Sequence, residues 1–145
     1  MATSSPVAVL GIDHIVLRVR DVARMVTFYG DVLGCKVEKV QEKLGLTHLR
    51  AGSALIDLIT LDGPLGMEGG AGPGREGRNV DHLCLRIATF DATALKAHLA
   101  AHGVAPSAIG GRFGAEGEGP SLYITDPEGN VIELKGPPGP VPSGV

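Results

Sequence analysis

The chain has 145 residues, 43% of them hydrophobic, which suits one compact domain with a sizeable core. Thirteen basic and sixteen acidic residues give a formal charge of −3, and the aromatic residues are three phenylalanines and two tyrosines. This composition provides neither a phosphate-neutralising patch nor a base-stacking platform, which argues against a nucleic-acid partner. We see no signal-peptide pattern and no apolar run near the roughly 20 residues that span a bilayer, so we expect a cytoplasmic protein without a membrane partner.

The first half of the chain is predicted to form a strand, a helix and three further strands. Alternating side chains in DHIVLRV, residues 13–19, indicate the first strand. A helix is predicted over residues 22–33, because apolar residues recur there at helical spacing between a capping Asp21 and a stopping Gly34. Three short runs then predict strands at residues 35–40, 46–52 and 53–61.

The second half repeats this order. DHLCLRI, residues 81–87, matches the first strand, and a helix is predicted over residues 92–102, stopped by Gly103. Strands are expected at residues 103–109, 120–125 and 130–135. Three stretches rich in glycine and proline are predicted to be loops and a tail, at residues 62–79, 109–120 and 136–145.

Repetition of the same element order indicates an internal duplication. We therefore predict an α+β fold in which two tandem β-α-β-β-β modules form a curved sheet, or a pair of half-barrels, around a metal cleft. A single domain would span residues 11–136, with flexible tails at 1–10 and 137–145. Within it, module one would cover 11–62, a linker 63–79 and module two 80–136.

Four side chains occupy matched positions of the two modules. With a side-chain period of two, His14 and His82 face away from the core-facing residues of their strands. LIDLI (55–59) and VIELK (131–135) place Asp57 and Glu133 between aliphatic residues. A single such histidine or acid is more often structural, but four at matched positions favour a divalent metal site. Two imidazoles and two carboxylates suit iron, manganese, nickel, zinc or cobalt, with open positions for substrate.

Tyr123 is expected to lie near the four candidate metal ligands, because the expected strand pairing brings it close to Glu133. A three-residue hairpin loop at residues 127–129, with Gly129 at positive φ, pairs Tyr123 with Glu133. The phenol would then lie beside a metal-ligand carboxylate, and the alternative is a tyrosine that only packs across strands. The side of the sheet that His48 faces depends on strand register, which the sequence leaves open.

The sequence resembles the vicinal oxygen chelate superfamily, which includes glyoxalase I, extradiol dioxygenases, methylmalonyl-CoA epimerase, fosfomycin-resistance transferases and bleomycin-binding proteins. The resemblance covers about residues 11–136 and rests on four motifs, DHIVLRV, FYGDVLG, DHLCLRI and LYITDPEGNVIEL. Within the superfamily the chain looks like the small glyoxalase-domain proteins. The motifs are specific for the superfamily and weak for the individual member.

The resemblance implies a metal at His14, His82 and Glu133, with Asp57 where glyoxalase I has a fourth ligand. Aspartate is one methylene shorter than the glutamate found there, so two roles are open for Asp57: direct ligand, or holder of a metal-bound water. Arg18 matches a glutathione-recognising arginine of glyoxalase I, and its alternative role is an ion pair. Arg112 is a candidate contact for an anionic substrate group, against the alternative of a solvated loop arginine.

Three functions follow from the resemblance. The first is a metal-dependent glyoxalase-like isomerase or lyase, in which Glu133 or Asp57 moves a proton of a small substrate with vicinal oxygens. The second is an extradiol Fe(II) dioxygenase with Tyr123 beside its substrate. The third is a binding protein that sequesters a small molecule, as bleomycin-resistance proteins do.

We also predict a homodimer, because each module alone leaves an unpaired sheet edge. In this superfamily the modules close on each other within one chain or exchange across a two-fold dimer. The linker is long enough for either arrangement. Exchange would combine His14 and Asp57 of one subunit with His82 and Glu133 of the other.

Overall fold

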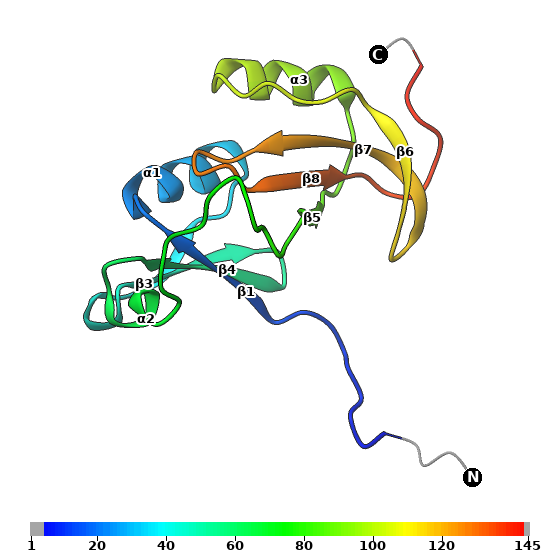
Figure 1. Cartoon of the computed structure of the whole chain (residues 1–145). Coiled ribbons are helices and arrows are strands. Elements are labelled where there is room, and N and C mark those ends of the chain that lie inside the picture. The colour runs from blue at the N-terminus through cyan, green and yellow to red at the C-terminus, as the bar shows by residue number, and fades with distance from the viewer. Residues whose placement is uncertain (1–4, 144–145) are drawn as a thin grey trace.

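The computed structural model describes residues 5–143. Each half of the chain contributes one four-stranded sheet and one main helix (Figure 1). The elements of the first half are β1 (His14–Val19), α1 (Val22–Thr27), the π-helical turn η1 (Phe28–Val32), β2 (Val37–Gln41), the 3-10 turn η2 (Glu42–Leu44), β3 (Leu46–Ala51) and β4 (Ala54–Thr60). After a short helix α2 (Pro64–Met67), the second half continues with β5 (Leu83–Arg86), α3 (Ala92–Ala101), β6 (Gly110–Gly114), β7 (Gly117–Thr125) and β8 (Val131–Lys135).

The two sheets have the same topology. Their strand orders are β1-β4-β3-β2 and β5-β8-β7-β6. Strand β1 pairs in parallel with β4, and β5 pairs in parallel with β8. All other neighbouring strands are antiparallel. The predicted duplication and α+β class are therefore confirmed. Strands β1 and β5 each have one hydrogen-bonding edge without a strand partner within residues 5–143.

Both predicted helices begin at the expected residues; the first continues from α1 through η1 to Val32, and α3 ends at Ala101, one residue before the predicted end. The Asp21 carboxylate accepts a hydrogen bond from the Arg24 amide at 2.9 Å, and Asp91 accepts one from Ala94 at 3.0 Å. Such caps satisfy amides that have no partner within the helix. Positive φ angles of 70° at Gly34 and 69° at Gly103 then turn the chain out of each helix.

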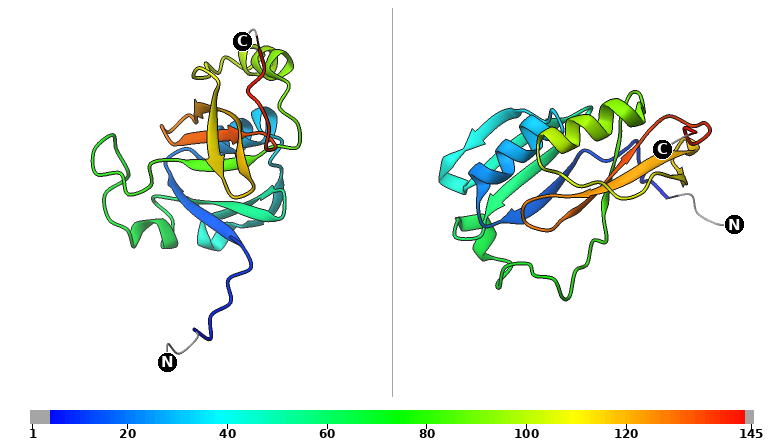
Figure 2. Two further views of the ribbon diagram at one scale, coloured as in Figure 1. Left: turned by 90° about the vertical axis from the view of Figure 1, so that its right-hand side faces the viewer. Right: turned by 90° about the horizontal axis from the view of Figure 1, so that it is seen from above.

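One core joins the two modules. It contains buried residues of both sheets and of both helices, among them Val19, Met25, Leu58, Leu99, Leu122 and Leu134. Figure 1 shows α1 between the sheets and α3 over the second sheet, and Figure 2 shows the two helices side by side. The buried Tyr29 hydroxyl donates to Asp126 Oδ2 at 2.8 Å, and the Glu128 carboxylate accepts hydrogen bonds from the Arg20 and Asp21 amides. These bonds tie the β7–β8 turn to the start of α1 and to η1.

Three sequence predictions were wrong in part or in full. The stretch predicted as a loop at residues 62–79 contains the short helix α2. Residues 103–109 form no strand, and the glycine-rich stretch expected to be a loop forms β6 and the start of β7, turning at residues 115–116. Glycine disfavours strands through its backbone entropy. Here the hairpin passes over the Lys135 side chain, and a Cβ at Gly114 would lie 2.6 Å from Lys135 Cε. A side chain at this position would displace the end of the Lys135 side chain, a contact that composition alone does not show.

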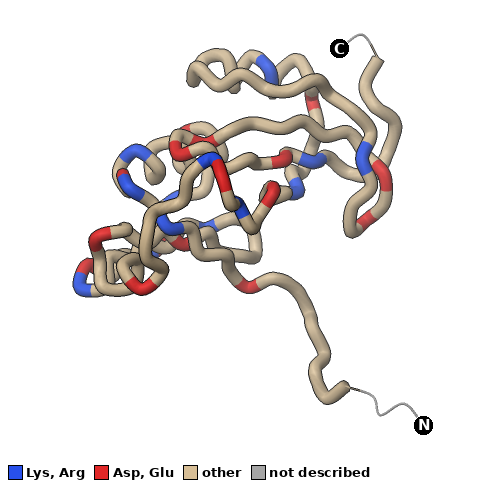
Figure 3. The backbone as a smooth tube through the Cα atoms, in the orientation of Figure 1, with Lys and Arg blue, Asp and Glu red and all other residues tan. Residues whose placement is uncertain are grey.

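Residues 5–13 form an extended arm that leaves the body of the molecule (Figures 1 and 2). Most of its large hydrophobic side chains are strongly exposed, including Leu10 and Ile12. The tails predicted at the two ends of the chain include residues 1–4 and 144–145, which lie outside the described residues. Figure 3 shows acidic and basic residues interspersed along both modules. Among residues 5–143, no helix combines the length and apolarity needed to cross a bilayer.

Candidate functional site

The first half-site lies on the open face of the first sheet, in a hollow of about 540 Å³ that His14, His48 and Asp57 help to line. Asp57 is buried, with 4% exposure. His48 Nδ1 lies 2.8 Å from Asp57 Oδ1, and its Nε2 lies 2.8 Å from Gln41 Nε2. Since an amide nitrogen only donates, His48 accepts from Gln41 and donates to Asp57. This fixes one oxygen of Asp57 and leaves the other for a ligand.

The second half-site lies on the open face of the second sheet, in a cavity of about 310 Å³ that includes His82 and Glu133. His82 Nε2 is 3.1 Å from Glu133 Oε2. Tyr123 pairs with Glu133 across β7 and β8, as the hairpin prediction required, and the hairpin has the expected Asp126–Asn130 bond at 2.9 Å. The Tyr123 ring meets the His82 ring edge to face, with centroids 5.3 Å apart.

An aspartate precedes each candidate histidine and hydrogen bonds to it. His14 Nδ1 lies 2.6 Å from Asp13, and His82 Nδ1 lies 2.7 Å from Asp81. The Asp13 hydrogen bond raises the pKa of His14 above its ordinary value. A carboxylate only accepts, so both rings hold the Nδ1 proton and present Nε2. Metal-binding histidines are commonly oriented in this way.

The donor set of the second half-site fits a divalent cation. Because Nδ1 of His82 already donates to Asp81, its Nε2 can approach Glu133 Oε2 only as a second N–H donor or through a shared cation. Glu133 Oε1 is buried and has no hydrogen-bond partner among residues 5–143. A buried carboxylate oxygen without a partner is costly, and metal coordination would satisfy it.

The two half-sites remain separate in one chain. Among the residues that the structure describes, no three histidine, cysteine, aspartate or glutamate side chains are close enough to hold a metal together. His14 and Asp57 line one hollow, whereas His82 and Glu133 line another. The metal cleft expected from the sequence is therefore not formed within a single chain. The two half-sites occupy matched positions on their sheets. The edge strand β1 borders the first half-site, and the edge strand β5 borders the second.

Neither cysteine takes part as a thiolate. Cys35 is buried and Cys84 is exposed, and both are free. Partial desolvation and the nearby Glu133 carboxylate raise the pKa of Cys84 to about 11. The Cys84 thiol therefore stays protonated at neutral pH, which removes it as a nucleophile.

The two predicted substrate arginines are engaged with the protein. Arg18 donates from Nε and Nη2 to the Gly66 carbonyl, at 3.1 and 2.8 Å, and from Nη2 to Gly70 at 2.6 Å. It thereby holds the loop after α2. Arg112 donates to the Ser121 carbonyl and hydroxyl, each at 2.9 Å, and lies 4.6 Å from the centre of the Tyr123 ring. Its guanidinium positions the tyrosine.

Sequence reasoning missed the residues that support the ligands. His48 and Gln41 lie on strands whose register the sequence does not give. The repeated Asp-His pair was a usable signal, because Asp13 and Asp81 recur at the same offset in each module. Lys135, which is buried and lines the cavity of the second half-site, could not be recognised from the sequence, since a lysine at the end of a strand is ordinarily exposed.

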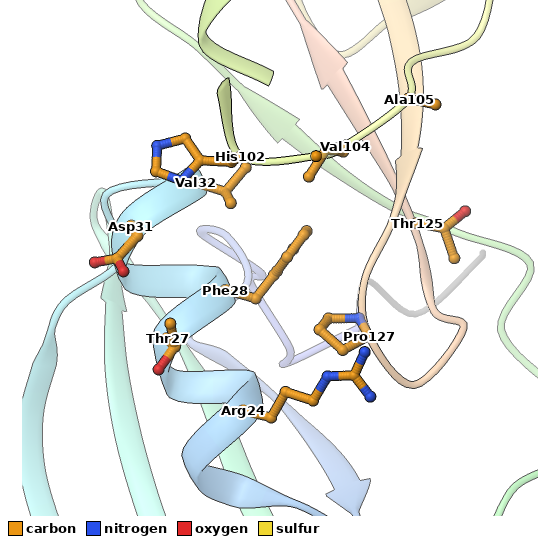
Figure 4. Close-up of a pocket in the computed structure, with 11 residues that line it drawn as sticks. Arg24, Thr27, Phe28, Asp31, Val32, His102, Val104, Ala105, Thr125 and Pro127 are labelled. Carbon is orange, nitrogen blue, oxygen red and sulfur yellow. The ribbon is translucent and has the colours of Figure 1, made fainter. Parts of the chain in front are cut away.

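A further hollow of about 570 Å³ lies at the joint between the modules (Figure 4). Side chains of the first helix, among them Phe28, line one side, and His102, Val104 and Pro127 from the second module also line it. It contains none of the four candidate metal ligands.

The sequence and fold of the chain are similar to those of known proteins. Residues 11–134 match the family model described as Glyoxalase/Bleomycin resistance protein/Dioxygenase superfamily. A virulence protein of Salmonella typhimurium superposes with a TM-score of 0.72 and 28% identity over 91% of this chain and 100% of that one. An integron cassette protein from V. cholerae gives 0.68 and 28% over 90% and 97%. The lactoylglutathione lyase of Agrobacterium tumefaciens, at 19% identity, gives 0.64 over 91% and 96%, a likeness of fold alone.

Proposed function

The chain belongs to the glyoxalase/bleomycin resistance protein/dioxygenase superfamily, and from this premise we propose that it is a metal-dependent, glyoxalase-like isomerase or lyase. Its substrate would be a small molecule with two neighbouring oxygens. The observation that carries the proposal is the matched pair of half-sites, each with an aspartate-oriented histidine and a buried carboxylate on an open sheet face.

We place the complete site across a homodimer. His14 and Asp57 of one protomer would face His82 and Glu133 of its partner, because one chain does not bring them together. Strands β1 and β5 lie next to the half-sites, and each has an unpaired edge. In the proposed dimer the β1 edge of one protomer would approach the β5 edge of its partner. The extended arm and Phe113, which is 85% exposed, supply apolar surface for such an interface.

Each residue then has a role. His14, His82 and Glu133 would hold the divalent metal, which supplies Lewis-acid polarisation of the substrate oxygens. Asp57 keeps one oxygen fixed by His48 and has the other free, so it is placed to take a proton from the carbon beside a carbonyl or to hold a water. Tyr123, positioned by Arg112, would border the substrate on the Glu133 side. We assign Arg18 to anchoring the loop after α2.

The test combines metal analysis with turnover. Purified protein reconstituted separately with nickel, manganese, iron, zinc and cobalt should bind one metal per site, as measured by elemental analysis. It should also turn over the methylglyoxal–glutathione hemithioacetal or related α-hydroxy ketones. Absence of bound metal would contradict the enzyme proposal as a whole. Bound metal without turnover of these substrates would contradict only the glyoxalase chemistry.

A second candidate is an extradiol-type Fe(II) dioxygenase. The observation that favours it is Tyr123, whose ring lies against His82 and whose position pairs with Glu133. Anaerobic loading with Fe(II), followed by catechols and oxygen, should give a coloured ring-cleavage product if this candidate holds. Colourless reactions across several catechols would remove it. If metal binds and both assays are negative, a sequestering protein is the remaining candidate.

A further inference from the structure

A buried lysine shares the cavity of the second half-site. Lys135 follows Glu133 by two residues on β8 and points to the same open face of the sheet. It is 6% exposed, and its Nζ has no hydrogen-bond partner among residues 5–143. An ammonium group kept out of water without a partner is costly. Glu133 shares the cavity, but it makes no ion pair with Lys135 among residues 5–143, so the ammonium is open to an anion from outside the chain.

The other cation of this cavity is already neutralised. Arg86 lies opposite Lys135 in the pairing of β5 with β8. Its Nε donates to Glu116 Oε2 at 2.5 Å, and its Nη1 donates to the Ile87 carbonyl. Glu116 lies in the β6–β7 turn, so this ion pair also holds the hairpin over the cavity. Among residues 5–143, Lys135 is therefore the cation of the cavity that makes no ion pair or hydrogen bond.

The hairpin is shaped around the lysine. A Cβ at Gly114 would lie 2.6 Å from Lys135 Cε, and a Cβ at Gly119 would lie 2.5 Å from the Pro137 carbonyl oxygen and 3.1 Å from Lys135 Nζ. Glycines at both positions therefore leave room for the lysine chain to run under β6 and β7. The two-residue step from Glu133 to Lys135 separates their backbones by about 7 Å. A small substrate could reach both groups at once.

We propose that Lys135 binds an oxyanion of the substrate, a carboxylate or a phosphate-type group, while the vicinal oxygens lie beside Glu133. The substrate class is then a small anionic compound, which deepens the proposed function. The position of the reacting oxygens rests on that function, whereas binding of the anion requires only the cavity. An ammonium gives charge-assisted hydrogen bonds to either kind of oxyanion.

The test measures anion binding to the whole protein, with and without bound metal. Inorganic phosphate, methylphosphonate and lactate are each titrated, and the amide NMR signals of Gly114, Gly119 and Lys135 are followed. Wild-type protein should show saturable shifts with at least one probe. The probe that binds more tightly identifies the oxyanion as phosphate-type or carboxylate.

Two variants and a control decide the role of Lys135. Lys135→Met should weaken anion binding about tenfold or more, with an unchanged or raised Tm because an unmatched buried charge is removed. Gly114→Ala keeps the charge but displaces the lysine chain, so it should also weaken binding. Lys96→Met, on α3, should bind as wild type does.

Three outcomes would overturn the proposal. One is that no probe shifts these signals. Another is equal binding by Lys135→Met and wild type, and the third is a large fall in Tm for Lys135→Met, which would show a structural lysine. Because the metal-free arm is included, anion binding that persists without any metal affinity would count against the proposed enzyme and not against this subsite.

Discussion

The two half-sites share a scaffold, but the surroundings of their candidate metal ligands differ. In the first, His14 stands on an edge strand with 48% of its side chain exposed, and Asp57 is held through His48 and Gln41. In the second, His82 is 31% exposed, and Glu133 is buried with one oxygen unpaired. A tyrosine, a lysine and the β6–β7 hairpin line this side as well. Duplication preserved the ligand positions, while their surroundings diverged.

These different surroundings suggest different functions for the two half-sites. A carboxylate whose oxygen is already fixed by a histidine hydrogen bond is suited to holding or moving a proton. A carboxylate whose oxygen is buried and unsatisfied is stabilised by a bound cation. We therefore expect the second half-site to dominate metal affinity and substrate recognition, and the first to complete the coordination and supply the base.

The largest expected effect comes from removing the two carboxylate charges separately. Glu133→Gln should reduce metal affinity by more than the roughly 10–100-fold that loss of a supporting residue costs, and Asp57→Asn should reduce it less. Isothermal titration with each metal measures this difference. Glu118→Gln, on the exposed side of β7, is the matched control. Equal losses for the two site variants would remove the distinction between the half-sites.

The exposed arm offers a way to separate the half-sites physically. Leu10→Glu combined with Ile12→Glu should convert the proposed dimer to a monomer at micromolar concentration, because two charges would have to be buried in the interface. Light scattering measures the mass, and circular dichroism checks that the fold is kept. Val40→Glu, on β2, should remain dimeric. A double variant that stays dimeric would show that the arm lies outside the interface.

Substitution of the aspartates that precede the histidines tests whether the aspartate–histidine hydrogen bonds contribute equally to metal binding in the two half-sites. Asp13→Asn and Asp81→Asn should each weaken metal binding about 10-fold or more, since each removes the carboxylate that orients a ligating ring. The same titration measures both variants. If neither affects metal binding, the aspartate–histidine bonds serve only the local backbone.

The smallest expected effect concerns the protonation of His14. Its pKa is raised by the hydrogen bond to Asp13, so the imidazolium form should persist to higher pH than in an ordinary histidine. Proton NMR of the metal-free protein should show a midpoint above 6.5, and Asp13→Asn should move that midpoint down. A midpoint unchanged by the substitution would show that the bond is absent in solution.

Much of the fold could be predicted from the sequence because duplication doubles every local signal. Helix limits at Gly34 and Gly103, the pairing of Tyr123 with Glu133 and the faces of His14 and His82 all follow from period and turn chemistry. The β6–β7 hairpin could not be predicted, because the contact of Gly114 and Gly119 with Lys135 is a tertiary contact that composition does not show. His48 as the partner of Asp57 depends on register between β3 and β4, which is set by tertiary packing.

The central claim is that one metal site is built from two chains, and subunit mixing tests it most directly. A His14→Ala chain and a Glu133→Ala chain carrying different affinity tags are refolded together, and the heterodimer is isolated and assayed for metal. A site shared across the dimer predicts one intact site per heterodimer, with almost none in either parent homodimer. A heterodimer that binds no more metal than the parents, although it forms, would contradict the claim.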